Sequence, residues 1–600
     1  MAAIESALER ALTRWEHCGR PGAPSAGFAL SRLPGRRSRG VYRAGTGQAV
    51  FESDEHILLM VPAPDEQHIA LQLAGRADEA GHLAVLNVSS GALRRYADIH
   101  CRYDPMQWAM DSRTLSLIAR DPQRLVQIDV AREWVAESPV ASDARCRLFA
   151  PAPHWLAAES RAGMPTRLVR LDTGTHLVSF PTISSAHVIG NDAVVVQSGN
   201  SLHAVDVYSG AERWRWSDCT TSLTTVRVWE NEVYAIAVRA GKSVLLNIAD
   251  GVVQQDWTAR LGESVAAFSD VSVDVGGISA VIEAPSSPPK VVTLSSRQGI
   301  GDQLPPRDGD DRAAETTWHE FRADDGCILS LVVTSPRGLV GPAPTILTCY
   351  GGFGVASLPV FEPTIPAWIE SGGRYATAHI RGGGEHGAQW RAGGYGARKR
   401  RGIDDLASAA RWLVAAQLAR ADSLVLVGAS HGGTVVASCV LGHPAICAGF
   451  VVTAAPLDLL ALDQHPLGRL WRDEFGAGSD AAGQRELSEI SPLSRAQSLG
   501  GDTAPPRFLG IVLAEDSRVA PDDTHAFAAA LGVAGGEVTL WEAPGAGHGA
   551  NDLDSLHELG AVVLKFAAAT TFHGTSARTP AGTTPHTTPL TNEKDATHDA

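Results

Sequence analysis

The chain has 600 residues, of which 44% are hydrophobic and 20% charged, and its formal net charge at pH 7 is −15. This length predicts more than one domain with sizeable cores, and the negative charge argues against a nucleic-acid or anionic-membrane partner. No apolar run approaches the roughly 20 residues of a membrane helix. The first 20 residues contain Glu5 and Glu9 and lack the apolar core of a signal peptide.

Eight cysteines are scattered singly along the chain, with no C-x-x-C pair. This usage favours reduced thiols over a disulfide framework or a zinc site. We therefore expect a cytoplasmic protein with no metal and no cofactor.

The N-terminal segment, residues 1–30, is predicted to be a helix or arm. Ile4, Leu8, Leu12 and Trp15 recur at helical spacing. Because residues three and four apart share one face of a helix, this spacing predicts a short amphipathic helix.

Residues 31–315 show a repeat of short β-type runs. In each repeat, apolar residues lead to Asp, Asn or Ser and then to a turn. The marker positions are Asn87, Asp129, Asp172, Asp206, Asn247 and Ser295. Their spacing of about 40 residues is that of a four-stranded propeller blade. Six markers, with room for one earlier blade, predict an all-β propeller of about seven blades; a large β-sandwich is the alternative.

A charged, Pro- and Gly-containing linker at 302–314 separates the propeller from residues 316–570, where short apolar strands alternate with helices. The predicted strands are Ile328–Val333, Thr345–Cys349, Tyr375–Ile380, Ser423–Val427, Phe450–Thr453, Phe508–Leu513 and Val538–Trp541. The clearest helices are Asp404–Leu418, Ser430–Val440, Pro521–Leu531 and Leu553–Ala568. This alternation predicts an α/β domain with a mostly parallel sheet. Residues 571–600 read as a disordered tail.

Ser430 lies in Gly428-Ala429-Ser430-His431-Gly432, between a predicted strand and a predicted helix. This G-x-S-x-G pattern is typical of a nucleophile elbow, in which glycines leave room for a strained serine backbone. The serine Oγ would then be exposed at a helix N-terminus, where backbone N–H groups can receive an oxyanion.

Two later loops supply partners for that serine. Asp516 follows the strand Phe508–Leu513, and His548 follows the strand Val538–Trp541, flanked by glycines. The order Ser, Asp, His is that of α/β-hydrolases. A neutral imidazole can accept the serine proton, and a carboxylate fixes the tautomer of the imidazole. Three neighbouring acids are expected to be solvated or capping charges: Glu515, Asp522 and Asp523.

These residues resemble the prolyl oligopeptidase family of serine peptidases, in which a seven-bladed propeller covers an α/β-hydrolase domain. The resemblance covers residues 318–568 in sequence and the first half only in architecture. The motifs are Tyr350-Gly351-Gly352-Phe353-Gly354, Arg381–Gly387, Gly428–Gly433, Trp471–Gly476, Asp516–Val519 and Gly547-His548-Gly549.

The resemblance implies roles by position. Ser430 resembles the nucleophile, Asp516 the orienting acid and His548 the base. The hydroxyl of Tyr350 and the backbone N–H of His431 would be the two oxyanion donors.

The same resemblance implies a proline-accepting pocket. Phe353 and Trp471 would form its walls, because an aromatic face suits a flat pyrrolidine ring, and Phe475 would be a further substrate-binding residue. Arg518 would hold a substrate carbonyl, and Val519 would lie beside it. The chain departs from the family at His431, where Asn is usual, at Phe475, where Tyr is common, and at Ser517, where a second acid is usual.

The expected function is that of a monomeric serine oligopeptidase that cleaves short or unstructured peptides after proline. Two alternatives from the same fold stay open: a processing peptidase that trims the leader of a biosynthetic peptide, and an esterase or aminopeptidase relative. The alternative from another class is a catalytically inactive propeller that serves as an interaction protein.

Overall fold

The structure is a computed structural model. It describes the whole chain except Met1, Pro466 and residues 76–77, 152, 162, 259–264, 275–276, 297–298, 301–312, 477–480, 501–503, 550–551 and 573–600. The predicted linker and the predicted disordered tail therefore lie almost entirely outside the described residues. None of the helices that the structure describes has both the length and the apolar character that crossing a bilayer requires.

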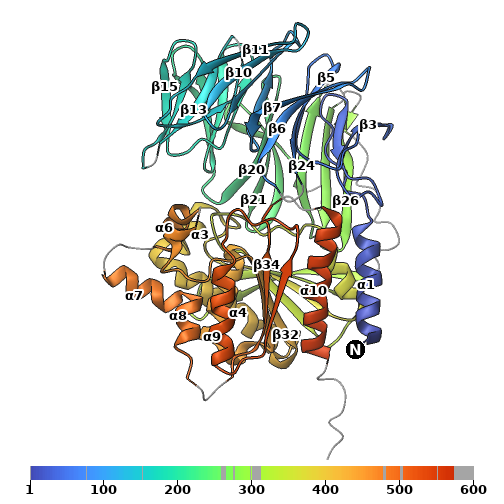
Figure 1. The fold of residues 1–600 in the computed structure, drawn as a ribbon, viewed down its shortest axis with the longest axis vertical. Helices are drawn as coiled ribbons and strands as arrows, with labels where there is room; N and C mark the ends of the chain where they lie inside the picture. The colour runs from blue at the N-terminus through green and yellow to red at the C-terminus, as the bar shows by residue number, and fades with distance from the viewer. Residues whose placement is uncertain are drawn as a thin grey trace, which may run out of the picture.

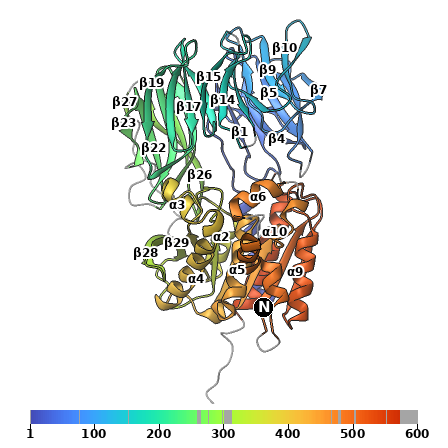
Figure 2. The ribbon, with the colours of Figure 1, turned by 90° about the vertical axis from the view of Figure 1, so that its left-hand side faces the viewer.

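The molecule has a β-rich half stacked on a half of mixed helices and strands (Figures 1 and 2). Seven small antiparallel sheets form the first half, and one eight-stranded sheet forms the second. This confirms the predicted combination of a seven-bladed propeller with an α/β-hydrolase domain.

The first blade has three strands, and each of the other six has four. The strands of the blades are β1 Phe28–Ser31, β2 Gly40–Arg43 and β3 Ala49–Phe51; β4 His56–Pro62, β5 His68–Ala74, β6 Gly81–Asn87 and β7 Leu93–Cys101; β8 Met106–Trp108, β9 Thr114–Ala119, β10 Arg124–Asp129 and β11 Trp134–Pro139; β12 Arg145–Leu148, β13 Leu156–Ser160, β14 Thr166–Arg170 and β15 His176–Phe180; β16 Ser185–Ile189, β17 Ala193–Ser198, β18 Ser201–Asp206 and β19 Glu212–Ser217; β20 Thr221–Trp229, β21 Glu232–Arg239, β22 Lys242–Ala249 and β23 Val252–Asp256; β24 Ala267–Asp274, β25 Gly277–Ala284, β26 Ser287–Ser296 and β27 Gly299–Ile300. Every marker position of the sequence repeat lies in the third strand of its blade or just after it.

Neighbouring blades share buried apolar side chains. Val195 of β17 and Val233 of β21 belong to one cluster, together with Trp216 of β19. Because side chains alternate between the two faces of a strand, each blade can pack against both of its neighbours.

The eight-stranded sheet has the order β28-β29-β31-β30-β32-β33-β34-β35. The pairs β28/β29 and β29/β31 are antiparallel and the remaining pairs are parallel. Its strands are β28 Ala314–Arg322, β29 Ile328–Pro336, β30 Thr345–Cys349, β31 Arg374–His379, β32 Leu424–Ala429, β33 Gly449–Thr453, β34 Arg507–Leu513 and β35 Val538–Ala543. The α-helices are α1 Ala2–Glu16, α2 Thr364–Glu370, α3 Gly387–Gly393, α4 Lys399–Ala415, α5 His431–Gly442, α6 Gly468–Phe475, α7 Ala481–Ile490, α8 Pro492–Gln497, α9 Asp522–Val533 and α10 Leu553–Thr571.

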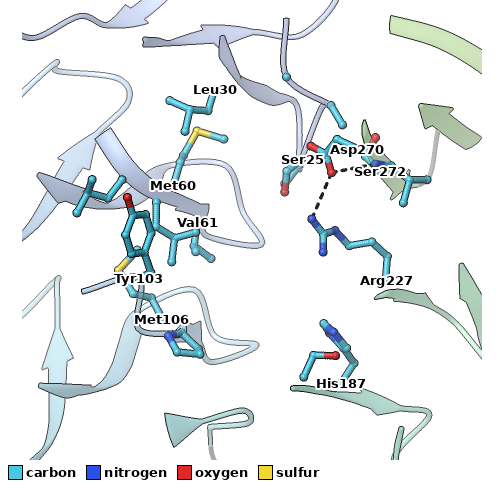
Figure 3. Close-up of a pocket in the computed structure, with 18 of the residues that line it drawn as sticks. Ser25, Leu30, Met60, Val61, Tyr103, Met106, His187, Arg227, Asp270 and Ser272 are labelled. Atoms are coloured by element: carbon cyan, nitrogen blue, oxygen red, sulfur yellow. Dashed lines mark hydrogen bonds and ion pairs between the residues drawn. The ribbon is translucent and has the colours of Figure 1, made fainter. Parts of the chain in front are cut away.

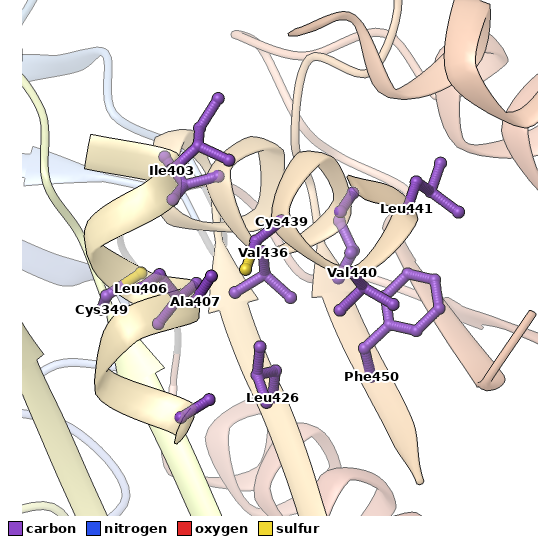
Figure 4. Packing of buried hydrophobic residues seen from close by; sticks show 14 of the residues in the cluster. Cys349, Ile403, Leu406, Ala407, Leu426, Val436, Cys439, Val440, Leu441 and Phe450 are labelled. Carbon is purple, nitrogen blue, oxygen red and sulfur yellow. The ribbon is translucent and has the colours of Figure 1, made fainter. Parts of the chain in front are cut away.

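Helices cover both faces of this sheet. Leu426 of β32 packs toward α4 and α5, with Leu406 and Val436 among its cluster (Figure 4). The adjacent Val425 belongs to the cluster on the other face, with Leu12 of α1. The α1 helix thus lies beside α10 on the hydrolase half, although it begins the chain (Figure 1).

Candidate active site

Ser430 lies at a sharp turn between β32 and α5. Its φ of 51° and ψ of −129° place a non-glycine residue in a backbone region that is rarely occupied. A Cβ at Gly428 would lie 2.4 Å from the carbonyl oxygen of Gly432, and one at Gly432 would lie 2.5 Å from that of Cys349. The glycines are therefore required by close backbone approach, as the G-x-S-x-G pattern predicts.

The structure brings together the three predicted residues of the triad. The Nε2 atom of His548 lies 3.0 Å from Ser430 Oγ, and its Nδ1 atom lies 2.7 Å from Asp516 Oδ2. The side chains of His548 and Asp516 are 9% and 2% exposed. In this geometry His548 can accept the serine proton while Asp516 holds the opposite N–H.

Asp516 is held in the ionised state. Burial opposes its ionisation, but the hydrogen bond from His548 and those from the backbone N–H groups of Val519 and Arg518 outweigh burial, so the pKa of Asp516 lies below its usual value. The two N–H groups lie 3.0 Å and 2.8 Å from Oδ1. A carboxylate that stays charged can stabilise an imidazolium on His548.

Two donors lie beside the serine. His431 is the first residue of α5, whose first N–H groups have no acceptor within the helix. Tyr350 follows β30, and its side chain lies beside that of Ser430. Burial, and then the charge of Glu474, raises the pKa of Tyr350, so its hydroxyl keeps the proton that it would donate.

The side chain of His431 lies in a buried polar cluster. Its Nδ1 lies 2.9 Å from the carbonyl oxygen of Tyr350, and its Nε2 lies 3.1 Å from Lys399 Nζ. Burial, and then the charge of Lys399, lowers the pKa of His431 well below its usual value. The ring is therefore neutral, with Nδ1–H donating to Tyr350 and Nε2 accepting from Lys399.

Lys399 and Glu474 form a buried ion pair behind the serine. Nζ and Oε1 are 2.6 Å apart, and both side chains are 1% exposed. Sequence reasoning missed this pair because Lys399 stands in Arg398-Lys399-Arg400-Arg401, which reads as a solvated charge run. Its presence in one helix with buried apolar residues was the only available signal.

Two of the aromatic residues predicted to bind substrate pack against the ring of His431. Phe475 stacks on His431 with ring centroids 5.2 Å apart, and Phe353 meets the same ring edge-on at 5.5 Å. Phe353 is half-buried, whereas Phe475 is 3% exposed. Trp471 and Val519 are also buried, and the ring of Trp471 lies 5.0 Å from that of His465.

Arg518 is engaged by the propeller. Its Nε lies 2.8 Å from Glu79 Oε2, and a second guanidinium nitrogen contacts Oε1. Arg102 of the propeller also pairs with Glu79, at 2.6 Å. Glu79 is a second residue that sequence reasoning missed, because it is 439 residues from Arg518.

Among the neighbouring acids, Glu515 and Asp522 are exposed, as expected. The expectation of a solvated or capping role is wrong for Asp523. Its Oδ2 accepts the backbone N–H groups of Leu457 and Asp458 at 2.9 and 3.0 Å, and lies 3.2 Å from Nε2 of His465. Asp523 thus fixes the loop after β33, because buried N–H groups need acceptors. In the part of the chain that the structure describes, no three His, Cys, Asp or Glu side chains gather as metal ligands would.

The second half of the chain is similar in sequence to known proteins. Residues 359–571 match the model of the prolyl oligopeptidase family. A prolyl endopeptidase from Elizabethkingia miricola is 29% identical over 214 residues, which are 35% of this chain and 30% of that protein. The chain therefore matches less than a third of the length of this relative.

Solved structures match over nearly the whole chain. A prolyl endopeptidase superposes with a TM-score of 0.80 at 19% identity, covering 95% of this chain and 93% of that one. Prolyl oligopeptidase B from Galerina marginata, bound to a 35-residue hydrolysis and macrocyclization substrate, gives 0.78 at 17% identity, covering 95% and 91%. Residues 359–571 are therefore similar to the prolyl oligopeptidase family of serine peptidases, and the whole chain has the fold of a propeller with an α/β-hydrolase domain that these structures share.

Proposed function

We propose that the chain is a serine oligopeptidase that hydrolyses short or unstructured peptides on the carboxyl side of proline. The observation that carries this proposal is the relay from Ser430 through His548 to Asp516, with hydrogen bonds of 3.0 and 2.7 Å. The roles assigned to these residues, and to the donors at Tyr350 and His431, are part of the proposal.

The relay supports acyl transfer in two steps. His548 takes the proton from Ser430 Oγ as the oxygen attacks the scissile carbonyl carbon, and then gives that proton to the leaving amine. The oxyanion is stabilised by Tyr350 Oη–H and by the N–H of His431. His548 then takes a proton from a water molecule as the water oxygen attacks the carbonyl carbon of the acyl-enzyme. His548 gives this proton to Ser430 Oγ as the bond between the carbonyl carbon and Oγ breaks.

Proline preference rests on the relatives and on the aromatic residues near the serine. Relatives named prolyl endopeptidase and prolyl oligopeptidase share the peptidase segment. Phe353 and Phe475 lie against His431, next to Ser430. A proline at the cleavage position has no N–H to satisfy and presents a flat apolar ring, which suits such a surface. Trp471, Arg518 and Val519 complete the proposed substrate-binding set.

The test is turnover of a reporter peptide with proline before the scissile bond. Ser430→Ala should abolish turnover, whereas Ser498→Ala, at an exposed position, should leave it unchanged. A fluorophosphonate should label Ser430 in the wild type, as mapped by mass spectrometry. Full activity in Ser430→Ala, or no labelling in the wild type, would contradict the assignment, and the latter would favour an inactive interaction protein.

Substrate preference distinguishes the proposed proline-specific peptidase from the alternative activities. A peptide library and p-nitrophenyl esters, assayed together, should show a preference for proline. A preference for alanine, leucine or an ester would instead favour an aminopeptidase or esterase. Leader removal from a biosynthetic peptide is supported by the relatives named dual function macrocyclase-peptidase.

A cytoplasmic, monomeric state is also part of the proposal. None of the eight cysteines, all of which the structure describes, forms a disulfide, which fits a reducing compartment. Size-exclusion chromatography with light scattering tests the monomer.

A further inference from the structure

The propeller contains a large cavity along its axis. The cavity has a volume of about 1290 Å³ and is lined by the first strands of blades two to seven, which are β4, β8, β12, β16, β20 and β24, together with Leu30 of β1 (Figure 3). Met60 and Tyr103 face His187 and Arg227 across it (Figure 3). We call this cavity the propeller channel.

The wall of the propeller channel carries more positive than negative charge. Six arginines and three carboxylates line it. The carboxylates are already satisfied: Asp104 pairs with Arg120, Asp270 lies 3.4 Å from Arg227, and Glu283 accepts the N–H of Phe361 at 2.9 Å. Among the described residues, Glu283 is thus the one lining acid outside an ion pair, and its side chain is buried.

Three of these arginines have no carboxylate of their own. No described acid forms an ion pair with Arg39, Arg145 or Arg147. Arg147 donates to the carbonyl oxygen of Ile183 and lies over the ring of Phe149, with its guanidinium carbon 5.3 Å from the centroid. Burial, and then other arginines, lowers the pKa of both Arg39 and Arg147, as expected where positive charge is uncompensated. In a chain whose net charge is −15, this is a local reversal of sign.

A series of ion pairs links the wall of the propeller channel to the candidate active site. Arg102 lines the channel and pairs with Glu79, which also pairs with Arg518. Arg518 is two residues after Asp516. A peptide held at Ser430 could therefore extend toward the arginines of the channel.

We propose that Arg39, Arg145 and Arg147 bind carboxylate groups of the peptide substrate within the propeller channel, so that acidic peptides are preferred. This inference rests on the proposed function in that the ligand is a peptide. Guanidinium groups donate paired hydrogen bonds to carboxylates. Inside a walled cavity these bonds are screened less than at an open surface, so a matching anion gains more.

The test is equilibrium binding to the full-length Ser430→Ala protein, measured by fluorescence anisotropy. The probes are peptides of about 15 residues, which span about 50 Å when extended. Each has one central proline and differs only in a distal block of four glutamates or four glutamines, with a free or amidated C-terminus. The glutamate arm tests side-chain carboxylates, and the C-terminal arm tests the terminal carboxylate.

We expect a carboxylate-bearing peptide to bind about tenfold more tightly than its neutral match at low salt, and the difference to shrink as salt rises. Adding Arg145→Gln and Arg147→Gln should reduce the preference to about twofold, because two of the three arginines are lost. The control pair is Arg94→Gln with Arg132→Gln, which changes net charge equally on outer, exposed parts of the blades and should keep the preference.

Equal binding of the acidic and neutral peptides, or a preference that survives the loss of Arg145 and Arg147, would overturn the inference. Circular dichroism of each variant establishes that the propeller is folded. Hydrolysis of the neutral, amidated peptide by the wild type reports separately on the proposed function. If that peptide is not cleaved while acidic peptides still bind preferentially, the cleavage assignment fails and the channel assignment stands.

Discussion

The two halves of the molecule hold positive charge in opposite environments. Behind Ser430, Lys399 is 1% exposed and meets a carboxylate at 2.6 Å and an imidazole nitrogen at 3.1 Å. In the propeller channel, Arg145 and Arg147 face a cavity and form no ion pair with a described carboxylate. A charge removed from water needs a partner, whereas a charge that faces a large cavity open to water does not.

This difference separates two uses of charge. The paired Lys399 has no capacity left for a ligand, so it can act only by holding its neighbours in place. The arginines of the channel keep unused donors, so they can act on a ligand that brings its own carboxylate. Charge that fixes geometry should show its effect in stability and kcat. Charge that meets a ligand should show its effect in affinity and salt dependence.

The largest expected effect comes from breaking the buried pair. Lys399→Met leaves Glu474 buried without its cation, and Oε2 of Glu474 already has no hydrogen-bond partner among the described residues. Loss of one partner of a buried pair costs about 3–5 kcal/mol. We expect the free energy of unfolding of the hydrolase half to fall by that amount, measured by urea denaturation followed by fluorescence.

Two further variants test whether the loss of stability comes from the buried charge. Replacing both partners, as Lys399→Met with Glu474→Leu, should recover most of the loss, because no charge is left buried. The surface pair of Lys565 with Glu9 provides the matched control, since these side chains are 43% and 50% exposed. If Lys399→Met costs no more than Lys565→Met, Lys399 is not the counter-charge that the geometry indicates.

The next effect concerns His431, where the chain departs from the family that it resembles. His431→Asn removes the acceptor of Lys399 and weakens the hold on the Tyr350 carbonyl. Since Tyr350 also contacts Ser430, we expect kcat to fall about tenfold, equivalent to about 1.4 kcal/mol, with KM nearly unchanged. A steady-state assay with the proline reporter peptide measures both constants. A change confined to KM would show that His431 contacts substrate instead.

The pH dependence of stability gives an independent test of His431. Its folded-state pKa is well below 6.5, so below pH 6.5 the unfolded chain binds a proton that the folded chain does not. The wild type should therefore lose stability as pH falls below 6.5, by up to about 1.4 kcal/mol per pH unit from this residue. His431→Asn should show a shallower decline. The acid limb of kcat/KM should not move, because His431 is neutral throughout.

Sequence patterns predicted the parts of this site that depend on local chain geometry. Ser430, Asp516 and His548 each follow a strand, and the carboxyl ends of parallel strands meet at one edge of a sheet. The marker positions also depend on local chain geometry, because in six of the seven blades the marker residue lies in the third strand or just after it.

The rest depends on contacts between segments that are far apart in the chain. A lysine within a run of cations gives no sign that it is buried, and 75 residues separate Lys399 from Glu474. Glu79 and Arg518 lie in different halves of the molecule. The docking of α1 on α10 joins the two ends of the described chain. No local pattern encodes such pairings.

The smallest expected effect concerns Glu79, which links the two halves. In the structure the Glu79 carboxylate pairs with the guanidinium of Arg518, which we propose binds the substrate carbonyl. Substrate must therefore compete with Glu79 for Arg518. Glu79→Gln removes the negative charge, and we expect KM for the neutral reporter peptide to fall about threefold with kcat unchanged. Glu55→Gln, which breaks a propeller ion pair with Arg95, is the control.

Salt should separate this role from a purely structural one. Rising ionic strength weakens the link between Glu79 and Arg518 in the wild type, so its KM should approach that of Glu79→Gln. A rise in KM on substitution would mean that Glu79 holds Arg518 in its working position. The charge of Glu79 would then act as that of Lys399 does, by holding its neighbours in place. Within the propeller half, only the arginines of the propeller channel would be left to act on a ligand.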